Sequence, residues 1–442
     1  MAGSDSILKR PTFASSNNSF AKFVARPVLR FIDREVAGGV LLLVATAAAL
    51  LWVNLGWGES YHDFWHTEIE LAVGSWHLPH MSVGHFVNDA LMALFFFVVG
   101  LEIKRELVTG DLSSPRAAAL PAIGALGGMV VPALLYFALN TSGEAARGWG
   151  IPMATDIAFA VGIVALLGSR VSPKIKLFLL TLAIVDDIGA IAVIAIFYTS
   201  DLSVKWLVTA ILGLVTVWIL QRARVWAIPV YAVLGVFIWY ATLESGVHAT
   251  IAGVALGLLT PARPLLGKRD AQQIVDALPS DATVDEVRHA SFLAQESVPL
   301  TVRLENLLHP FTAFIIIPIF ALANAGIELS GETISEAASS NVTLGIILGL
   351  VVGKPLGIGV FTWIATRFGF GLPEGVNWPQ FLGMALAAGI GFTVSIFVGG
   401  LAFDTQAVSE MAKIGILAAS ILAAIGALLL LRFSKSDSRS ND

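Results

Sequence analysis

Long apolar blocks separated by short polar segments run through most of this chain. Each block holds roughly 18 to 25 residues, the length that a helix rising about 1.5 Å per residue needs to cross a hydrocarbon core of about 30 Å. We therefore expect an all-α polytopic membrane protein with twelve transmembrane helices. The predicted spans are 36–56, 83–107, 119–139, 151–168, 177–198, 204–220, 225–242, 246–260, 310–327, 343–366, 380–402 and 410–431. The first block is too long for a cleaved secretory signal, so we expect it to stay in the mature chain.

Polar segments flank and interrupt a twelve-helix domain at residues 36–432. Residues 1–35 are predicted to be a cytoplasmic basic segment, either an amphipathic helix on the anionic inner leaflet or a basic tail that only sets the topology. Residues 262–309 form a cytoplasmic loop, in which "ATVDEVRHASFLAQESV" is either a helix over the cytoplasmic mouth or a linker. Residues 433–442 are predicted to be a cytoplasmic tail. Four basic residues recur at helical spacing in the first segment: Lys22, Arg26, Arg30 and Arg34.

On the opposite side, the segment "HTEIELAVGSWHLP" at 66–79 alternates around Val73, Gly74 and Ser75, which predicts a small external hairpin. An isolated two-stranded hairpin is marginally stable in water, so this one needs a partner surface. A homodimer contact through 66–79 is the natural candidate.

Lysines and arginines fall mainly on one side of the predicted membrane. Placing both termini and the loops after even-numbered spans on one side collects all but four of the 27 basic residues there. Three exceptions lie on the other side and Lys354 lies within a span. Because basic residues are enriched in cytoplasmic loops, both termini are predicted to be cytoplasmic. The three exceptions are Arg147, Lys205 and Lys413.

The composition agrees with a lipid-embedded chain, since 56% of the 442 residues are hydrophobic and only 13% are charged. The formal net charge is -5, and no basic run suggests a nucleic-acid partner. The chain contains no cysteine, which excludes disulfides, thiolate metal sites and cysteine nucleophiles.

Five ionisable residues are predicted to lie at membrane depth, where each costs at least about 2.5 to 3.5 kcal/mol and therefore needs a partner or a function. Adjacent helix positions point about 100° apart, so two neighbouring acids of one span cannot both face the same partner. We expect one of them to pair with the lysine and the other to face a water-filled cavity. The five residues are Asp89, Asp156, Asp186, Asp187 and Lys354.

A carboxylate without a permanent partner can hold a proton or a hard cation, because small cations prefer oxygen ligands. It cannot hold both comfortably. Competition between the two, combined with access that alternates between the two sides, is sufficient for cation/proton exchange. Acids that only stabilise helix packing are the alternative, and several such groups in separate spans favour transport over it.

Two predicted spans carry helix-breaking residues at mid-depth. Pro152 and Gly162 flank Asp156 in one of them, and Gly389 and Gly391 interrupt the other. Such a pair, one in each half of the chain, indicates an inverted-repeat transporter with unwound segments. Asp156 and Lys354 have the right signs to neutralise the helix ends that would meet there. Lys354 could thus either balance helix ends or pair with Asp186.

Seven segments resemble, in order and spacing, those of the NhaA-type bacterial sodium/proton antiporters. The resemblance runs from about residue 33 to residue 432, and seven motifs in one order are highly specific. This family is itself an established example of inverted-repeat transporters, so the interrupted spans are not independent support. The segments are "VNDALMALFFFVVGLEIKREL", "ATDIAFAVG", "LAIVDDIGAI", "SGVHATIAG", "ANAGI", "GKPLGI" and "GIGFTVSIF".

The resemblance implies inverted repeats at spans 3–5 and 10–12, with unwound spans 4 and 11 crossing at mid-membrane. It implies electrogenic export of sodium or lithium in exchange for external protons across the bacterial inner membrane, in the service of pH homeostasis and salt tolerance. No cofactor is implied, and the partners are the lipid bilayer and the transported ions Na+, Li+ and H+. The resemblance assigns cation and proton binding to four residues, Asp187, Asp186, Thr155 and Asp156, and places Lys354 opposite the acids.

Activation at alkaline pH is also implied, through a cluster at the cytoplasmic side. From the residues alone, "EIKRE" at a helix end would be a solvated, mutually paired cluster. His248 has a reference pKa of about 6.5, which suits a pH switch, although a packing histidine fits equally. The resemblance assigns the cluster to Glu102, Arg105, Glu106 and Glu305.

Other functions fit the chain less well. An intramembrane protease would need G-x-G-D or H-E-x-x-H, and the chain has neither motif. A closer rival is a transporter of the same architecture that moves potassium or an organic solute, coupled to sodium or protons. An ion channel has no need for acids and a lysine that trap an ion in one place. We therefore expect a secondary transporter and not an enzyme.

Overall fold

The fold is known from a computed structural model. The structure describes residues 36–69, 72–73, 76–77, 81–199, 201–225, 228–264, 266–267, 272–274, 276, 278–279, 281–373 and 375–434. The basic segment predicted at 1–35 and all but the first two residues of the tail predicted at 433–442 lie outside these residues.

Eight helical runs in the described part of the chain are long and apolar enough to cross a membrane, and the number rises to ten if each of two bent helix pairs is one span. Two further apolar helices, Ile228–Leu243 and Thr250–Leu259, are shorter than a typical span and occupy the places of the seventh and eighth predicted spans. The prediction of a helical, multi-pass membrane protein is confirmed. The continuous runs are Ala37–His66, Val83–Val108, Pro115–Leu139, Pro173–Phe197, Val204–Arg222, Leu300–Asn324, Asn341–Arg367 and Gln406–Phe433.

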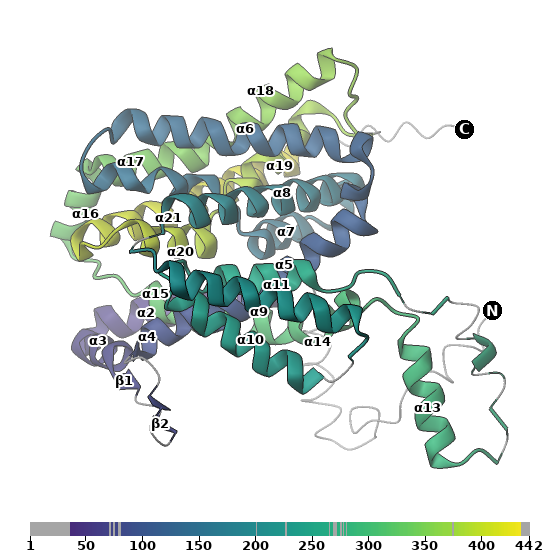
Figure 1. The fold of residues 1–442 in the computed structure, drawn as a ribbon. Coiled ribbons are helices and arrows are strands. Elements are labelled where there is room, and N and C mark those ends of the chain that lie inside the picture. The colour runs from purple at the N-terminus through teal and green to yellow at the C-terminus, as the bar shows by residue number, and fades with distance from the viewer. Residues whose placement is uncertain are drawn as a thin grey trace, which may run out of the picture.

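Figure 1 shows most of the helices gathered in two bundles, one above the other in that view, while α13 (Val284–Gln295) lies apart from both. The lower bundle contains α2 (Val36–Trp52), η3 (Val53–Trp57), α3 (Gly58–His66), α4 (Val83–Phe86), η4 (Val87–Leu91), α5 (Met92–Val108), α9 (Val204–Arg222), α10 (Ile228–Leu243), α11 (Thr250–Leu259), α14 (Leu300–Phe311), η8 (Thr312–Ile316) and α15 (Ile317–Asn324).

The upper bundle holds both bent pairs and the longest helices. It contains η5 (Asp111–Ser113), α6 (Pro115–Leu139), η6 (Glu144–Met153), α7 (Ile157–Leu166), η7 (Gly168–Arg170), α8 (Pro173–Phe197), α16 (Gly331–Ser339), α17 (Asn341–Ile347), η9 (Leu348–Gly353), α18 (Lys354–Arg367), α19 (Trp378–Ala388), α20 (Phe392–Ala402) and α21 (Gln406–Phe433).

Small residues let helices within a bundle pack backbone to backbone. A Cβ on Gly253 of α11 would collide with the carbonyl oxygen of Ala93, and a Cβ on Gly257 would lie 2.6 Å from the carbonyl oxygen of Phe97. Because lipid tails are as apolar as leucine, such close packing is a main source of helix association in membranes. The sequence "TIAGVALGLL" therefore determines how closely α11 approaches α5.

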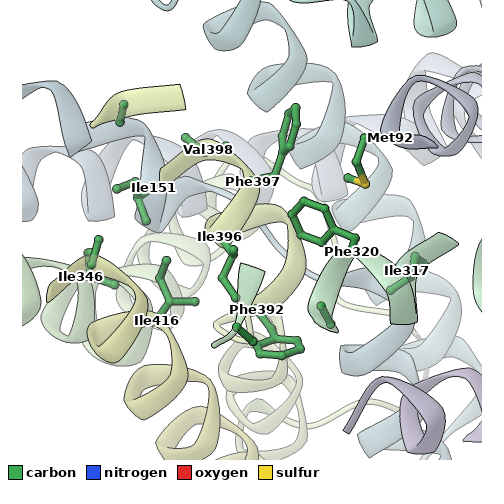
Figure 2. Close-up of a cluster of buried hydrophobic side chains, with 14 of the residues drawn as sticks. Met92, Ile151, Ile317, Phe320, Ile346, Phe392, Ile396, Phe397, Val398 and Ile416 are labelled. Atoms are coloured by element: carbon green, nitrogen blue, oxygen red, sulfur yellow. The ribbon is translucent and has the colours of Figure 1, made fainter. Parts of the chain in front are cut away.

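Side chains of α20 lie in the middle of the largest apolar cluster, as Figure 2 shows. Phe392, Ile396 and Phe397 all come from this helix and are at most 4% exposed. They pack with Ile151 of η6 and Phe320 of α15, among others. Helix α20 is thus held by apolar contacts with both bundles.

The segment near 66–79, predicted to be external, contains short antiparallel strands. β1 (Glu68–Ile69) pairs with β4 (Met81–Ser82), and β2 (Ala72–Val73) pairs with β3 (Trp76–His77). Its predicted role in a dimer stays a prediction.

Within the long loop predicted at 262–309, α13 (Val284–Gln295) begins with a capping box. The Thr283 hydroxyl accepts from the Glu286 N–H, and the Glu286 carboxylate accepts from the Thr283 N–H, which satisfies two otherwise unpaired donors. The start of α14 also lies within this loop.

Candidate ion-binding site

The two bent helix pairs meet at their breaks. η6 ends at Met153 and α7 begins at Ile157, with a bend of 43°, and α19 and α20 are separated by Gly389, Ile390 and Gly391 with the same bend. The N–H of Asp156 donates to the carbonyl of Ile390 over 2.7 Å. A backbone hydrogen bond therefore joins the two breaks directly.

Asp156 caps two helices with one carboxylate. Its Oδ1 accepts from the N–H of Phe159 at the start of α7. Its Oδ2 accepts from the N–H of Thr393, at 3.1 Å, and from the hydroxyl of Thr393, at 2.6 Å, at the start of α20. Helix N-termini carry partial positive charge, so a carboxylate is favourable there. Both oxygens of Asp156 are thus occupied by protein donors.

Lys354 lies at the C-terminal end of η6, where the partial charge is negative, and it also pairs with an acid. Its ammonium group donates to the carbonyl of Met153, the last residue of η6. The same group lies 2.9 Å from Asp186 Oδ2, and both side chains are fully buried. The two uses of Lys354 that the residues left open, ion pairing and balancing a helix end, thus occur together.

Thr155 connects Asp186 to the second break. Its Oγ1 lies 2.8 Å from Asp186 Oδ2 and 2.9 Å from the carbonyl oxygen of Ala388. A hydroxyl has one proton, so it can donate to only one of these acceptors at a time. Asp186 Oδ1 is buried and has no hydrogen-bond partner among the described residues. One oxygen of this carboxylate is therefore free to accept a proton or a cation.

Asp187 has no ion pair or hydrogen bond within the described part of the chain. Asp187 is 6% exposed and lies within electrostatic range of four other charged residues, Asp186, Glu102, Lys354 and Asp156. Three of these neighbours are acids. With Asp186 neutralised by Lys354 and Asp156 held by two helix ends, Asp187 carries the charge that nothing formally balances. A monovalent cation or a proton could balance it.

The η6 segment is held by side chains from four other helices. Runs of 3₁₀-helix longer than three or four residues are uncommon, so a stretch of ten residues needs outside support. Four of its carbonyls accept from side chains, those of Ala145, Arg147, Ile151 and Met153. The respective donors are Tyr136 of α6, Tyr198 next to α8, Ser395 of α20 and Lys354 of α18.

Thr393, Ser395 and the two tyrosines are not among the site residues that sequence reasoning proposed. The only signal for Thr393 and Ser395 is their place directly after the Gly389 and Gly391 break. For Tyr136 and Tyr198 the sequence carries no such signal, because their acceptors are backbone carbonyls in another helix.

Asp89 is not among the residues bonded to the breaks. It lies half-buried in η4, where its backbone carbonyl accepts from the Trp239 indole over 2.9 Å. The neighbouring Asn88 and Asn324 exchange hydrogen bonds between η4 and α15. The position of Asp89 suits a structural role at the packing of η4.

The predicted regulatory residues of α5 and α14 come together. Arg105 Nη1 lies 2.5 Å from Glu305 Oε1, and Arg105 Nη2 lies 3.2 Å from Glu106 Oε1. Glu102 lies within electrostatic range of all three. The cluster therefore connects the lower bundle's α5 and α14 by charge.

His248 takes part in a different contact. Its Nε2 lies 2.7 Å from the carbonyl oxygen of Tyr198, at the end of α8. A carbonyl oxygen only accepts, so Nε2 carries a proton in this contact. His248 thus connects the loop before α11 to the upper bundle.

Comparisons with known proteins show the family of this chain. A family model described as "Na+/H+ antiporter 1" matches residues 29–431. The Na+/H+ antiporter NhaA 3 of Frankia alni is 48% identical over 412 residues, which cover 92% of this chain and 89% of that protein. The NhaA antiporter of Rhodopirellula baltica is 45% identical over 417 residues, covering 92% and 93%. That of Salmonella paratyphi B is 44% identical over 402 residues, covering 90% and 95%. The chain therefore belongs to the NhaA family of Na+/H+ antiporters.

Proposed function

We propose that this antiporter exchanges cytoplasmic sodium or lithium for external protons by letting the cation and the proton compete for Asp187 and Asp186. The observation that carries the proposal is the unequal pairing of two adjacent acids. Asp186 is neutralised by Lys354 at 2.9 Å, whereas Asp187 has no bonded partner among the described residues. A single unbalanced carboxylate suits one monovalent charge at a time.

Sodium would be bound by oxygen atoms that the site already presents. Hard cations prefer carboxylate, hydroxyl and carbonyl oxygens. Candidates are Asp187, the unbonded Oδ1 of Asp186 and the hydroxyl of Thr155. We assign Asp156 to neutralising the positive helix ends, because both of its oxygens already accept from α7 and α20.

The proposed architecture is that of twelve spans in the bacterial inner membrane, with both termini cytoplasmic. Spans 3–5 and 10–12 would be inverted repeats, and the breaks at Asp156 and Ile390 would be the unwound parts of spans 4 and 11. Support comes from the two bends of 43° and from the hydrogen bond between the breaks. Non-helical backbone is tolerated at membrane depth only where protein or water satisfies it, as the hydrogen bonds of this site do.

We also propose that the cluster of Glu102, Arg105, Glu106 and Glu305 regulates transport by pH. It joins α5 to α14 by charge, so a change in its protonation would alter the packing of those helices. His248 is a second candidate, since its hydrogen bond to Tyr198 bridges the two bundles.

The test is reconstitution of the full chain into vesicles that contain a pH dye, followed by pulses of sodium, lithium or potassium over a pH series. We expect proton flux with sodium and lithium that rises with pH and is abolished by Asp187→Asn. The matched control is Asp63→Asn, the same chemical change at an exposed acid of α3, which should leave flux unchanged. Equal flux from Asp187→Asn would refute the site assignment. A response to potassium alone would favour a potassium transporter.

A further inference from the structure

A groove on the surface of the upper bundle lies between α18 and α19. Its volume is about 200 Å³, and its lining includes Pro355, Gly359, Trp363, Trp378 and Leu382. Gly359 forms part of its floor, and a Cβ there would lie 3.2 Å from Leu382 Cδ2. A side chain at this position would narrow the groove.

The surroundings of the groove are apolar and exposed. Leu356 is 51% exposed, Trp363 is 48% exposed, and Leu382 on the facing helix is 40% exposed. The helix that carries the first two belongs to the run Asn341–Arg367, which is long and apolar enough to span a membrane. In the membrane, these side chains would contact acyl chains and not water.

A positive charge lies at one end of the groove. Arg367, in the last turn of α18, is exposed, and its guanidinium lies 5.0 Å from the ring centroid of Trp363. Trp363 and Trp378 both line the groove. Tryptophan favours the boundary between hydrocarbon and headgroups, and arginine binds phosphate well. This end therefore matches the level of the lipid phosphates.

The distance between Arg367 and the far end of the groove agrees with the depth of one leaflet. Arg367 lies about 18 Å along the helix axis from Pro355, and half of the hydrocarbon core is about 15 Å. An acyl chain running from Arg367 to Pro355 would therefore extend from the headgroups to the bilayer middle. The inner end of the acyl chain would lie beside Pro355, the residue that follows Lys354.

We propose that this groove binds an acyl chain of a phospholipid whose anionic headgroup pairs with Arg367. The occupant follows from the apolar lining, from the depth of one leaflet and from the cationic Arg367 at the headgroup end. Negative headgroups are attracted by basic residues at this level, whereas a zwitterionic lipid has no net charge to offer.

The experiment uses the full chain in nanodiscs that contain phosphatidylglycerol or phosphatidylcholine carrying a photoreactive group at the end of one acyl chain. Cross-linked peptides are mapped by mass spectrometry. We expect phosphatidylglycerol to label α18 and α19 near Gly359 and Leu382. Gly359→Leu, which fills the groove, should lose most of this labelling. Arg367→Gln should lower the preference for phosphatidylglycerol over phosphatidylcholine about fivefold.

The matched control is Gly39→Leu, the same change at a helical glycine with nothing within 4 Å of its Cβ, which should keep the labelling. Leu382→Trp, which fills the groove from the facing helix, replaces Gly359→Leu if that variant does not fold. Undiminished labelling in the filled variants would overturn the proposal. Equal labelling of the wild-type groove by both lipids would overturn it too, because the contact would then be a general one with the bilayer.

Discussion

The ammonium nitrogen of Lys354 lies 2.9 Å from Asp186 Oδ2, and both side chains are fully buried. Two charges taken out of water are stable only when they compensate each other, and removing one partner leaves the other without compensation. Within the described residues, the pair also leaves the neighbouring Asp187 without an ion-pair partner.

The first prediction concerns this pair. Lys354→Met should lower the free energy of unfolding by about 3 to 5 kcal/mol, because Asp186 is then left buried and unpaired. Combining it with Asp186→Leu should restore most of that loss, since the buried charge is gone. Denaturant unfolding of the purified variants in detergent measures both values. If the double variant were as unstable as Lys354→Met, the ion pair would not be the cause.

A second prediction concerns the double cap formed by Asp156. Asp156→Ala removes the acceptor for the starts of α7 and α20, and a lost N-cap costs about 0.5 to 2 kcal/mol at each helix. We expect a loss of stability of about 2 kcal/mol and strongly reduced transport. Asp156→Asn should keep more of the stability, because its amide oxygen can still accept.

The control for this cap is Ser330→Ala, which removes the N-cap of α16 without touching either break. It should cost about 1 kcal/mol and leave transport unchanged. Unfolding in detergent and flux in vesicles are measured on the same preparations. A loss from Asp156→Ala no larger than that from Ser330→Ala would contradict the double cap.

A third prediction tests the close contact between α5 and α11. Gly253→Ala should destabilise the protein by about 1 to 3 kcal/mol, because the new methyl group would collide with the backbone of Ala93. Gly162→Ala in α7 is the control, since nothing lies within 4 Å of its Cβ. There alanine should be neutral or stabilising by about 0.4 to 1 kcal/mol. Equal effects of the two changes on the thermal unfolding temperature would argue against close helix packing.

A fourth prediction concerns the effect of low pH on helix α13. Hydrogen bonds from the Thr283 N–H and hydroxyl lower the pKa of Glu286 below its ordinary value of 4.5. Because the pKa of Glu286 is lowered in the folded state, its carboxylate stabilises the helix above pH 4.5. This stabilisation is lost as the pH falls through the pKa of the folded state. Amide hydrogen exchange across α13, corrected for the intrinsic exchange rate, should therefore show less protection in acid.

Glu286→Ala should reduce this protection already at neutral pH and add no further loss on acidification. Asp281→Ala, which removes an exposed acid just before the capping box, should behave like the wild type. An acid-induced loss of the same size in Glu286→Ala would assign the effect to another group.

The helical runs of the structure agree closely with the predicted spans where an apolar block is continuous. The block predicted at 83–107 corresponds to Val83–Val108, and the block at 343–366 lies within Asn341–Arg367. Agreement is poorer around the fourth span, predicted at 151–168, where the helical segment begins at Glu144. Its first turns are polar, and Tyr136 and Tyr198 hold two of their carbonyls by hydrogen bonds.

The candidate site was only partly predictable. Asp156, Asp186, Asp187 and Lys354 stand out in the sequence, because an ionisable group in a hydrophobic block is costly wherever the block packs. Thr393 does not stand out, since a hydroxyl is inexpensive in a helix and its importance depends on its contact with Asp156, 237 positions away.

The sequence by itself determined that this chain enters a membrane and which charged residues it carries there, because both follow from the cost of placing each side chain in lipid. The tertiary structure decided which of the adjacent acids pairs with Lys354 and left the other without a bonded partner among the residues that the structure describes. It also decided that one carboxylate caps two helices. Hydrogen bonds and ion pairs act over about 3 Å, so they depend on which distant segments the fold brings together.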